Sequence, residues 1–358
     1  MADETLFAGS GGFATLTAAR SGARKGAVLE IGNPESKVNT LPPEALTEIG
    51  QALDAVEADG SLEFLVLCGG EGRIHAGADV NMFAGEIAPS GDGKKIDLGA
   101  VDAYLKQGTA LDVRIKKLSQ KLVTVSAMYG ERFGGSVEWP LMATYCVAAE
   151  DTGIQLSEVN IGILPGWDGV LNVAIKAGPA NALYMGTTGA RLTAEQMLEA
   201  GIVDAVVPEE QIVARALELA GSKPPKREGV EGKDLLGEEE LLKLITERLD
   251  TARYQALRDE VAGEKEGADP KELSKSVDKR LAKLGKPSAP LAVEAVTAFV
   301  QDCQNADLSD VSVIETLAFK EAALCAALMK TRDRVLGIDS ILKAREDVLN
   351  KIAIFTKS

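Results

Sequence analysis

The chain alternates short apolar runs with amphipathic helical stretches, and this order constrains its fold more than any other feature. Apolar runs at 27–31, 64–68 and 122–128 predict buried strands. Turns follow them and lead into helical patterns, the clearest at 43–58 and 98–119. The rhythm of strand, turn and helix recurs roughly every 30–50 residues and predicts an α/β fold in which helices cover sheets.

The same patterns continue towards residue 207. The further elements we expect are a short helix at about 79–86, a helix containing Glu138, strands at 145–149 and 154–156, helices at 169–186 and 193–200, and a strand at 203–207.

Composition narrows the classes of function. The chain has 358 residues, of which 46% are hydrophobic and 4% aromatic, so it can bury a large and mainly aliphatic core as one large domain with an appendage, or as two domains. Its formal net charge of −15 argues against a nucleic-acid partner and disfavours docking on an anionic membrane. A few local cations can still hold an anionic ligand.

Cysteine and histidine usage argues against disulfides and metals. The four cysteines form no CxxC pair, so we expect a reducing, cytoplasmic setting. The single histidine, His75, leaves no cluster for a zinc site, and we expect no metal. The acidic first residues do not resemble a signal peptide, and no apolar run is long enough to predict a membrane span.

Two glutamates in glycine-rich, apolar surroundings are the strongest functional signal. Glu138 follows Gly134-Gly135, and Glu158 lies twenty residues further on, before Pro165-Gly166. A carboxylate is costly to bury unless it is paired, hydrogen-bonded or neutralised. Adjacent glycines let backbone N–H groups approach a ligand. The pattern therefore predicts paired acid/base groups facing an oxyanion site, with an Ala76-Gly77-Ala78-Asp79 turn upstream.

The order of these motifs resembles the crotonase (enoyl-CoA hydratase/isomerase) superfamily. The likeness covers most of the chain except 223–286 and the extreme ends; its segments are 27–46, 65–83, 123–169, 191–207 and 288–345. It implies a spiral of repeated ββα units with a C-terminal helical region for trimerisation. It divides the chain into a core with an acyl-CoA site at 1–207, a connecting helix with a charged helical insert at 208–287, and an oligomerisation region at 288–358.

The resemblance also implies roles for individual residues. The backbone N–H groups of Ala76 and Gly135 correspond to the two oxyanion donors of the family. Glu138 and Glu158 correspond to its two catalytic glutamates, which hydratases carry together; we expect Glu138 to activate water and Glu158 to exchange the Cα proton. The implied substrate-binding residues are His75, Gly77, Ala78, Asp79, Gly134, Gly166, Trp167 and Asp168.

Departures from the family pattern leave the acyl group open. The family usually has Pro-Gly-x-Gly-Gly where this chain has Trp167 and Asp168 within 165–169. Both side chains either border the acyl pocket or point into packing. Glu131-Arg132 stands where the family has small or aliphatic residues. His75 either contacts the substrate or acts as a spacer, and Asp79 is expected to cap the following helix.

We therefore expect an acyl-CoA hydratase of fatty-acid or aromatic-acid degradation that adds water to an enoyl- or dienoyl-CoA. Coenzyme A enters as part of the substrate and no other cofactor is expected. The family implies a homotrimer or a dimer of trimers. Two alternatives stay open: a hydrolase of a cyclic oxo-acyl-CoA or of a thioester, and a non-catalytic acyl-CoA-binding protein that uses 223–286 as an interaction surface. That segment is expected to be a solvated helical hairpin.

Overall fold

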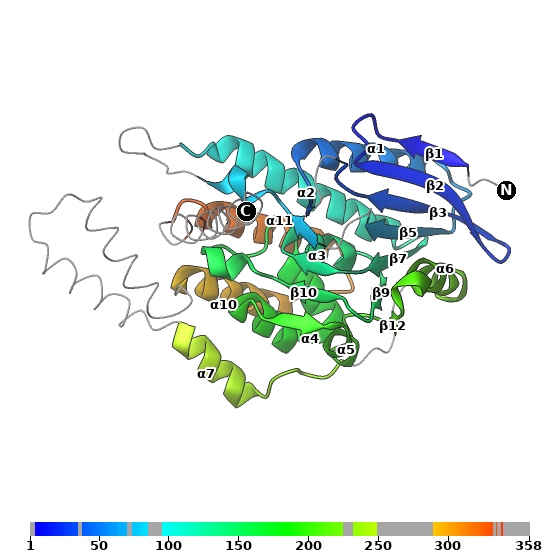
Figure 1. Cartoon of the computed structure of the whole chain (residues 1–358). Coiled ribbons are helices and arrows are strands. Elements are labelled where there is room, and N and C mark those ends of the chain that lie inside the picture. The colour runs from blue at the N-terminus through cyan, green and yellow to red at the C-terminus, as the bar shows by residue number, and fades with distance from the viewer. Residues whose placement is uncertain are drawn as a thin grey trace, which may run out of the picture.

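A computed structural model describes residues 4–34, 38–69, 74–84, 95–224, 232–248, 289–331, 334 and 338. Within these residues the chain forms two sheets surrounded by helices (Figure 1). No helix of the described part has the length and apolar character needed to span a bilayer.

The larger sheet has seven strands. Its order is β1 (Thr5–Ala8), β2 (Ala14–Ser21), β3 (Arg24–Ile31), β5 (Phe64–Gly69), β7 (Val123–Met128), β9 (Tyr145–Ala149) and β12 (Ala205–Val207). The first three strands pair antiparallel, and the pairs from β3 to β12 are parallel. All residues of β7 and β9 are buried, as expected for parallel strands covered on both faces.

The smaller sheet has five short strands. Its order is β11 (Arg191–Thr193), β10 (Gly153–Gln155), β8 (Glu131–Phe133), β6 (Ile74–Gly77) and β4 (Val38–Thr40). The strand pairs β3/β4, β5/β6, β7/β8 and β9/β10 follow one another in sequence, and each pair contributes one strand to each sheet. Four successive turns of a spiral result, which confirms the predicted ββα arrangement.

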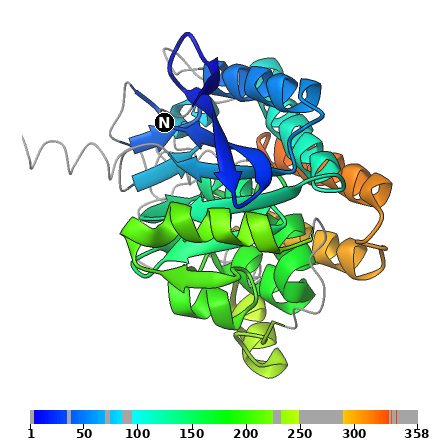
Figure 2. The same cartoon turned by 90° about the vertical axis from the view of Figure 1, so that its right-hand side faces the viewer.

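Helices follow the strand pairs and pack around the two sheets. They are α1 (Pro43–Ala58), η1 (Val80–Phe83), α2 (Leu98–Leu118), α3 (Gly135–Leu141), η2 (Glu158–Ile161), α4 (Gly169–Thr188), α5 (Ala194–Glu199), η3 (Glu209–Gln211) and α6 (Ile212–Ser222). Helix α6 buries an apolar stripe against one face of the sheet, while α1 and α2 lie on the other side (Figure 2). The sheet is therefore the middle layer of the core.

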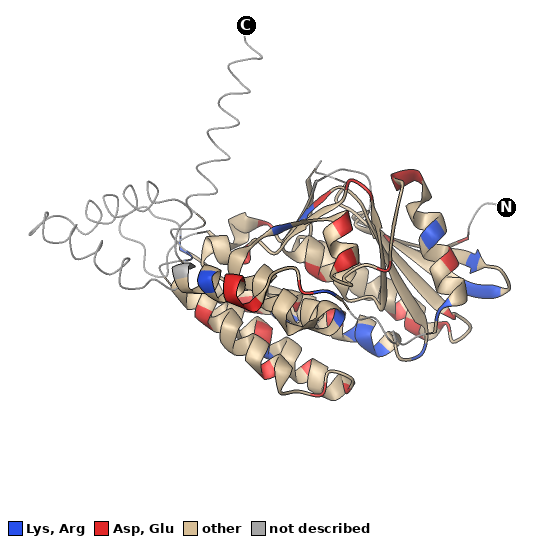
Figure 3. Cartoon of the chain, turned by 90° about the horizontal axis from the view of Figure 1, so that it is seen from below, with Lys and Arg blue, Asp and Glu red and all other residues tan. Residues whose placement is uncertain are grey.

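The described residues 289–331 are mostly helical, as predicted. Helices α10 (Pro290–Gln304) and α11 (Val311–Leu328) pack on α4 and α2 respectively. Of the charged segment 223–286, the structure describes 223–224 and 232–248, where α7 (Glu238–Arg248) forms a helix that contacts α4 and α10. The predicted helical hairpin lies mostly outside the described residues. In the view of Figure 3, acidic and basic residues are interspersed over the described chain.

Some expectations on secondary structure were incomplete. The helix expected at 79–86 is the short 3₁₀ helix η1, and residues 85–86 lie outside the described part. Strands β1, β2, β4, β6, β8 and β11 were not predicted from the sequence. All of them except the eight-residue β2 have three or four residues, which are too few positions for alternation to be recognised.

Glu48 fastens the N-terminal strands to helix α1. Its buried carboxylate accepts hydrogen bonds from the backbone N–H groups of Phe13 at 2.8 Å and Ala14 at 3.2 Å, and a further one from Gly11. Three donors that would otherwise lack a partner are thereby satisfied, and hydrogen bonds to a charged acceptor are stronger than neutral ones.

We expect Glu48→Ala to lower the free energy of unfolding by about 2–4 kcal/mol, because several buried donors lose their acceptor. Urea denaturation followed by circular dichroism measures this. The exposed Glu44 on the same helix provides the control, and Glu44→Ala should change stability by less than about 1 kcal/mol. Equal losses in the two variants would contradict the proposed anchoring.

Candidate active site

Two glycines bring the end of β6 against the start of α3. Gly77 has a φ of +67°, and a Cβ atom there would lie 2.6 Å from the N atom of Gly135 and 2.5 Å from that of Ser136. No side chain fits in such a gap, so only glycine permits this approach. A Cβ atom on Gly135 would lie 3.5 Å from the backbone N of Ala78. The turn after β6 and the first residue of α3 therefore bring backbone amides close together.

The upstream turn offers two candidate oxyanion donors. Ala76, the predicted donor, lies within β6, one residue before Gly77. The amide of Ala78 lies just beyond the strand and is the one in direct proximity to Gly135. The structure thus adds Ala78, predicted only as a substrate-binding residue, as a candidate for the same role. Asp79 caps η1, as expected: its Oδ1 accepts the backbone N–H of Asn81 at 3.0 Å.

Glu138 lies on the first turn of α3 and is buried. Its Oε2 accepts hydrogen bonds from the backbone N–H groups of Trp167 at 2.8 Å and Gly169 at 2.9 Å. Burial raises the pKa of Glu138 well above its usual range, and the charges of Glu158 and Glu321 raise it further, while the two N–H donors oppose this shift. The protonated form of Glu138 is therefore more favoured than that of an exposed glutamate.

Glu158 begins η2, and its carboxyl group lies beside Gly134. A Cβ atom on Gly134 would be 2.6 Å from Oε1 of Glu158, and Oε2 is buried with no hydrogen-bond partner among the described residues. Burial raises the pKa of Glu158 to about 7, partly offset by a hydrogen bond from its own backbone N–H.

The structure thus brings Glu138, Glu158, Gly134 and Gly135 together. The charge of Glu158 is one of the causes that raise the pKa of Glu138, so the two carboxyl groups lie close enough to influence each other. Both pKa values are raised, which suits a pair that must both accept and donate a proton.

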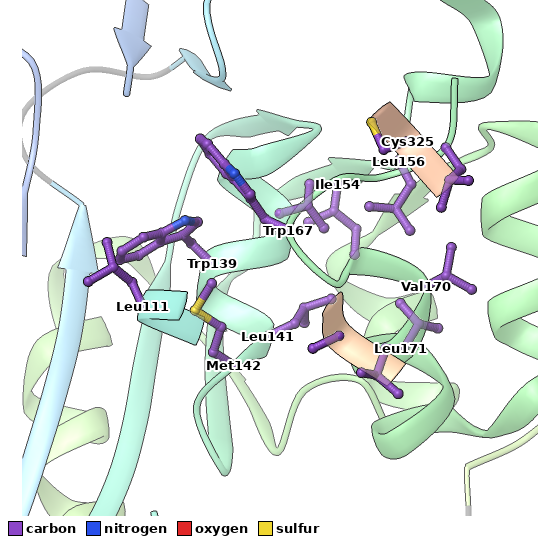
Figure 4. Close-up of a cluster of buried hydrophobic side chains, with 14 of the residues drawn as sticks. Leu111, Trp139, Leu141, Met142, Ile154, Leu156, Trp167, Val170, Leu171 and Cys325 are labelled. Carbon is purple, nitrogen blue, oxygen red and sulfur yellow. The ribbon is translucent and has the colours of Figure 1, made fainter. Parts of the chain in front are cut away.

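Trp167 packs over the start of α3. A Cβ atom on Gly135 would lie 2.5 Å from Cζ3 of the Trp167 indole, and the Tyr104 ring lies edge-on to that indole with 5.0 Å between ring centroids. Figure 4 shows the Trp167 and Trp139 indoles among buried apolar side chains that include Leu111 and Met142. Trp167 is therefore both packed in the core and in contact with Gly135. It narrows the space next to that residue.

Asp168 points into a buried charged cluster rather than capping α4. It is fully buried with φ = +69°, a conformation that disfavours residues other than glycine. The Nζ atom of Lys116 lies 4.0 Å from Asp168 and 2.8 Å from Asp112. Burial raises the pKa of Asp168 well above its usual range, and Asp112 raises it further. Lys116 supplies the positive charge that both carboxyl groups share.

A third buried glutamate, Glu321 on α11, was not predicted from the sequence. Its carboxyl oxygens accept hydrogen bonds from the backbone N–H groups of Val170 at 2.9 Å and Leu171 at 3.0 Å. Burial raises the pKa of Glu321 to about 8, and the two N–H donors oppose this shift. The available signal was an acid within an alanine-rich helical run, but only the fold shows that it meets the start of α4.

The structure separates His75 from the two catalytic candidates. Its imidazole is buried between the two sheets, where Nδ1 lies 3.1 Å from Nδ2 of Asn39 and the ring meets Tyr129 edge-on. Gly166 packs closely: a Cβ atom there would lie 2.6 Å from the side chain of Leu105. Among the described residues, no three His, Cys, Asp or Glu side chains are grouped to hold a metal ion.

Comparison with known proteins identifies the family of this chain. Residues 24–223 match the sequence model of the Enoyl-CoA hydratase/isomerase family. The chain belongs to this family. The match includes every predicted site residue, from His75 to Asp168, and the family is the one that the sequence motifs resembled.

The chain matches only part of the length of its curated relatives. The chain is 33% identical over 205 residues to the fatty acid oxidation complex subunit alpha of Idiomarina loihiensis, which is 56% of this chain and 27% of that protein. The corresponding protein of Shewanella loihica is 33% identical over 206 residues, or 28% of its length. The chain therefore spans about a quarter of the relatives that it matches.

Solved structures agree on the fold. An enoyl-CoA hydratase from Rhodobacter sphaeroides 2.4.1 superposes with a TM-score of 0.60 at 20% identity, covering 92% of this chain and 90% of that one. A carnitinyl-CoA dehydratase from Mycobacterium thermoresistibile gives 0.58 at 19% identity, with 91% and 89% covered. At these identities the likeness shows a shared fold.

The raised pKa of Glu321 predicts a dependence of stability on pH. A carboxyl group whose pKa is higher in the folded state binds more protons in that state than in the unfolded state. The stability that Glu321 contributes in this way is fully present below about pH 4.5 and is lost as the pH rises through about 8. We expect the free energy of unfolding to fall over this range, and to fall less steeply in Glu321→Gln, by up to about 1 kcal/mol per pH unit.

Urea denaturation between pH 5 and pH 8.5 would measure the two slopes. Glu294→Gln, which changes an exposed glutamate on α10, is the matched control and should keep the wild-type slope. A wild-type slope in Glu321→Gln would contradict the assignment of a raised pKa to this residue.

Proposed function

We propose that this chain is an acyl-CoA hydratase that adds water across the double bond of an enoyl- or dienoyl-CoA. The observation that carries the proposal is the pair of buried glutamates beside the Gly134-Gly135 turn, both with raised pKa values. Membership of the enoyl-CoA hydratase/isomerase family supports an acyl-CoA thioester as the substrate. The relatives named as fatty acid oxidation complex subunits support a role in fatty-acid degradation.

The proposed chemistry needs three parts. The thioester oxygen gains negative charge as water adds to Cβ, and the backbone N–H of Gly135 stabilises it together with that of Ala76 or Ala78. Such a donor typically contributes about 10²–10³-fold in rate. One carboxyl group takes a proton from the attacking water and the other delivers a proton to Cα, so the pair finishes with the same number of protons. General acid/base catalysis contributes about 10²–10⁴-fold.

The binding residues, the oligomeric state and the cellular setting are further parts of the proposed function. The acyl-CoA would contact residues of the two glycine turns, including Gly134 and Gly166, with Trp167 limiting the acyl group. By analogy with the family, α10 and α11 would take part in a homotrimer or a dimer of trimers, and the protein would act in the cytoplasm without a further cofactor, nucleic acid or membrane as partner.

We expect Glu158→Gln to lower the turnover of a 2-enoyl-CoA by at least about 10²-fold while leaving acyl-CoA binding intact, because the amide cannot exchange the proton. Loss of the absorbance of the conjugated thioester measures turnover, and calorimetry measures binding. Glu195→Gln, in the first turn of α5 and exposed, should keep the wild-type rate. Wild-type turnover by Glu158→Gln would remove the proposed role of this residue.

A second candidate is hydrolysis of a cyclic oxo-acyl-CoA. The observation that favours it is the contact of Trp167 with Gly135, which leaves less room beside the oxyanion site and suits a compact acyl group. Mass spectrometry of an acyl-CoA panel separates the candidates by substrate: a linear enoyl-CoA that gains one water has been hydrated, whereas a saturated cyclic oxo-acyl-CoA has no double bond to hydrate and gains a water by ring opening. Release of free thiol would indicate thioester cleavage instead. Binding without any conversion would support the non-catalytic alternative.

A further inference from the structure

Three polar side chains form a row across the smaller sheet. The parallel registers place Asn39 of β4 beside His75 of β6, and His75 beside Arg132 of β8. Partners in register point to the same face of a sheet. All three side chains are buried, and Arg132 is only 4% exposed. A buried cation in this position replaces the small or aliphatic residue usual in the family.

The row faces a cavity between the two sheets. The cavity has a volume of about 50 Å³, and its lining includes Asn39, His75, Arg132, Cys68, Ser126 and Trp139. Glu138, Glu158 and Gly135 are not among its lining residues. The cavity is therefore distinct from the candidate active site, although α3 contributes to both.

One edge of the Arg132 guanidinium has no partner in the described part of the chain. Its Nη1 donates to the carbonyl oxygen of Ser136 at 3.2 Å, and its Cζ lies 5.8 Å from the centre of the Tyr129 ring. The buried Nε and Nη2 atoms have no hydrogen-bond acceptor among the described residues, and no carboxylate there forms an ion pair with Arg132. Burial lowers the pKa of Arg132 to about 10, so it stays positively charged at neutral pH.

We propose that this cavity binds a small carboxylate anion on the free edge of Arg132. An unpaired buried charge is strongly unfavourable, and the adjacent Nε–H and Nη2–H groups of an arginine match the two oxygens of a carboxylate. Ser126, whose buried hydroxyl also has no hydrogen-bond partner among the described residues, supplies a further donor in the lining. No acidic side chain lines the cavity.

The volume limits the size of the anion. A water molecule needs roughly 10–15 Å³ of such space, so the cavity accepts a few waters or one carboxylate with the size of formate or acetate. A carboxylate on a ring, such as benzoate, is too large. Since Arg132 also holds the carbonyl group of Ser136, the bound anion would restrain the residue that follows Gly135.

Sodium formate, sodium acetate, sodium benzoate and sodium phosphate, each titrated into the full chain at constant ionic strength with sodium chloride, test the proposal. Thermal unfolding is the measurement, because a ligand of the folded state raises the melting temperature in a saturable way. We expect formate and acetate to do so, and benzoate and phosphate to have no saturable effect.

Arg132→Met should abolish the formate response, and Arg132→Lys should raise the half-maximal concentration about 10-fold or more, because lysine keeps the charge but loses the paired donors. If Arg132→Met fails to fold, Arg132→Lys still decides. Arg191→Met is the matched control: Arg191 already pairs with Glu131, so its formate response should equal that of the wild type.

Three results would overturn the proposal. The first is a flat formate response in the wild-type chain, which would mean that another group satisfies Arg132. The second is an unchanged response in both Arg132 variants, which would place the anion elsewhere. The third is a saturable response to phosphate but not to formate. None of these outcomes depends on whether the chain hydrates an acyl-CoA, because no acyl-CoA is present in the assay.

Discussion

The start of helix α4 is the point on which the rest of the structure depends. Two buried carboxyl groups reach it from different elements: Glu138 of α3 accepts N–H bonds from Trp167 and Gly169, and Glu321 of α11 accepts those of Val170 and Leu171. The first amides of a helix have no partner within it, so they need acceptors from elsewhere. The two glutamates supply these and thereby join the spiral core to the C-terminal helices.

This use of backbone donors has an electrostatic consequence. Glu138, Glu158, Glu321 and Asp168 are all buried with raised pKa values, while Lys116 is the cation in direct contact with this group. Burial disfavours the charged form of each, and every charge on one raises the cost of a charge on the next. Burial and mutual repulsion therefore favour the protonated forms of these carboxyl groups, and a protonated carboxyl group can act as an acid.

The candidate active site and the cavity beside Arg132 lie next to each other in the core. Gly77 lies against Gly135, with the candidate active site on the side of the glutamates. His75 lies two residues before Gly77 on β6, and Ser136 follows Gly135 on α3; both line the cavity between the sheets. Strand β6 and helix α3 therefore contribute to both the candidate active site and the cavity.

The sequence by itself determined the repeating strand and helix order and the family, because these rest on periodicity and on local motifs, and it singled out Glu138 and Glu158 as the candidate acid/base pair. Helices α1 and α2 begin and end within a residue of their predicted positions. Only the tertiary structure decided that Ala78 lies next to Gly135, that Trp167 covers Gly135, and that Glu321 meets Val170 across 151 residues of chain. Such contacts depend on which faces of distant elements pack together, and a single sequence does not encode that pairing in any local pattern.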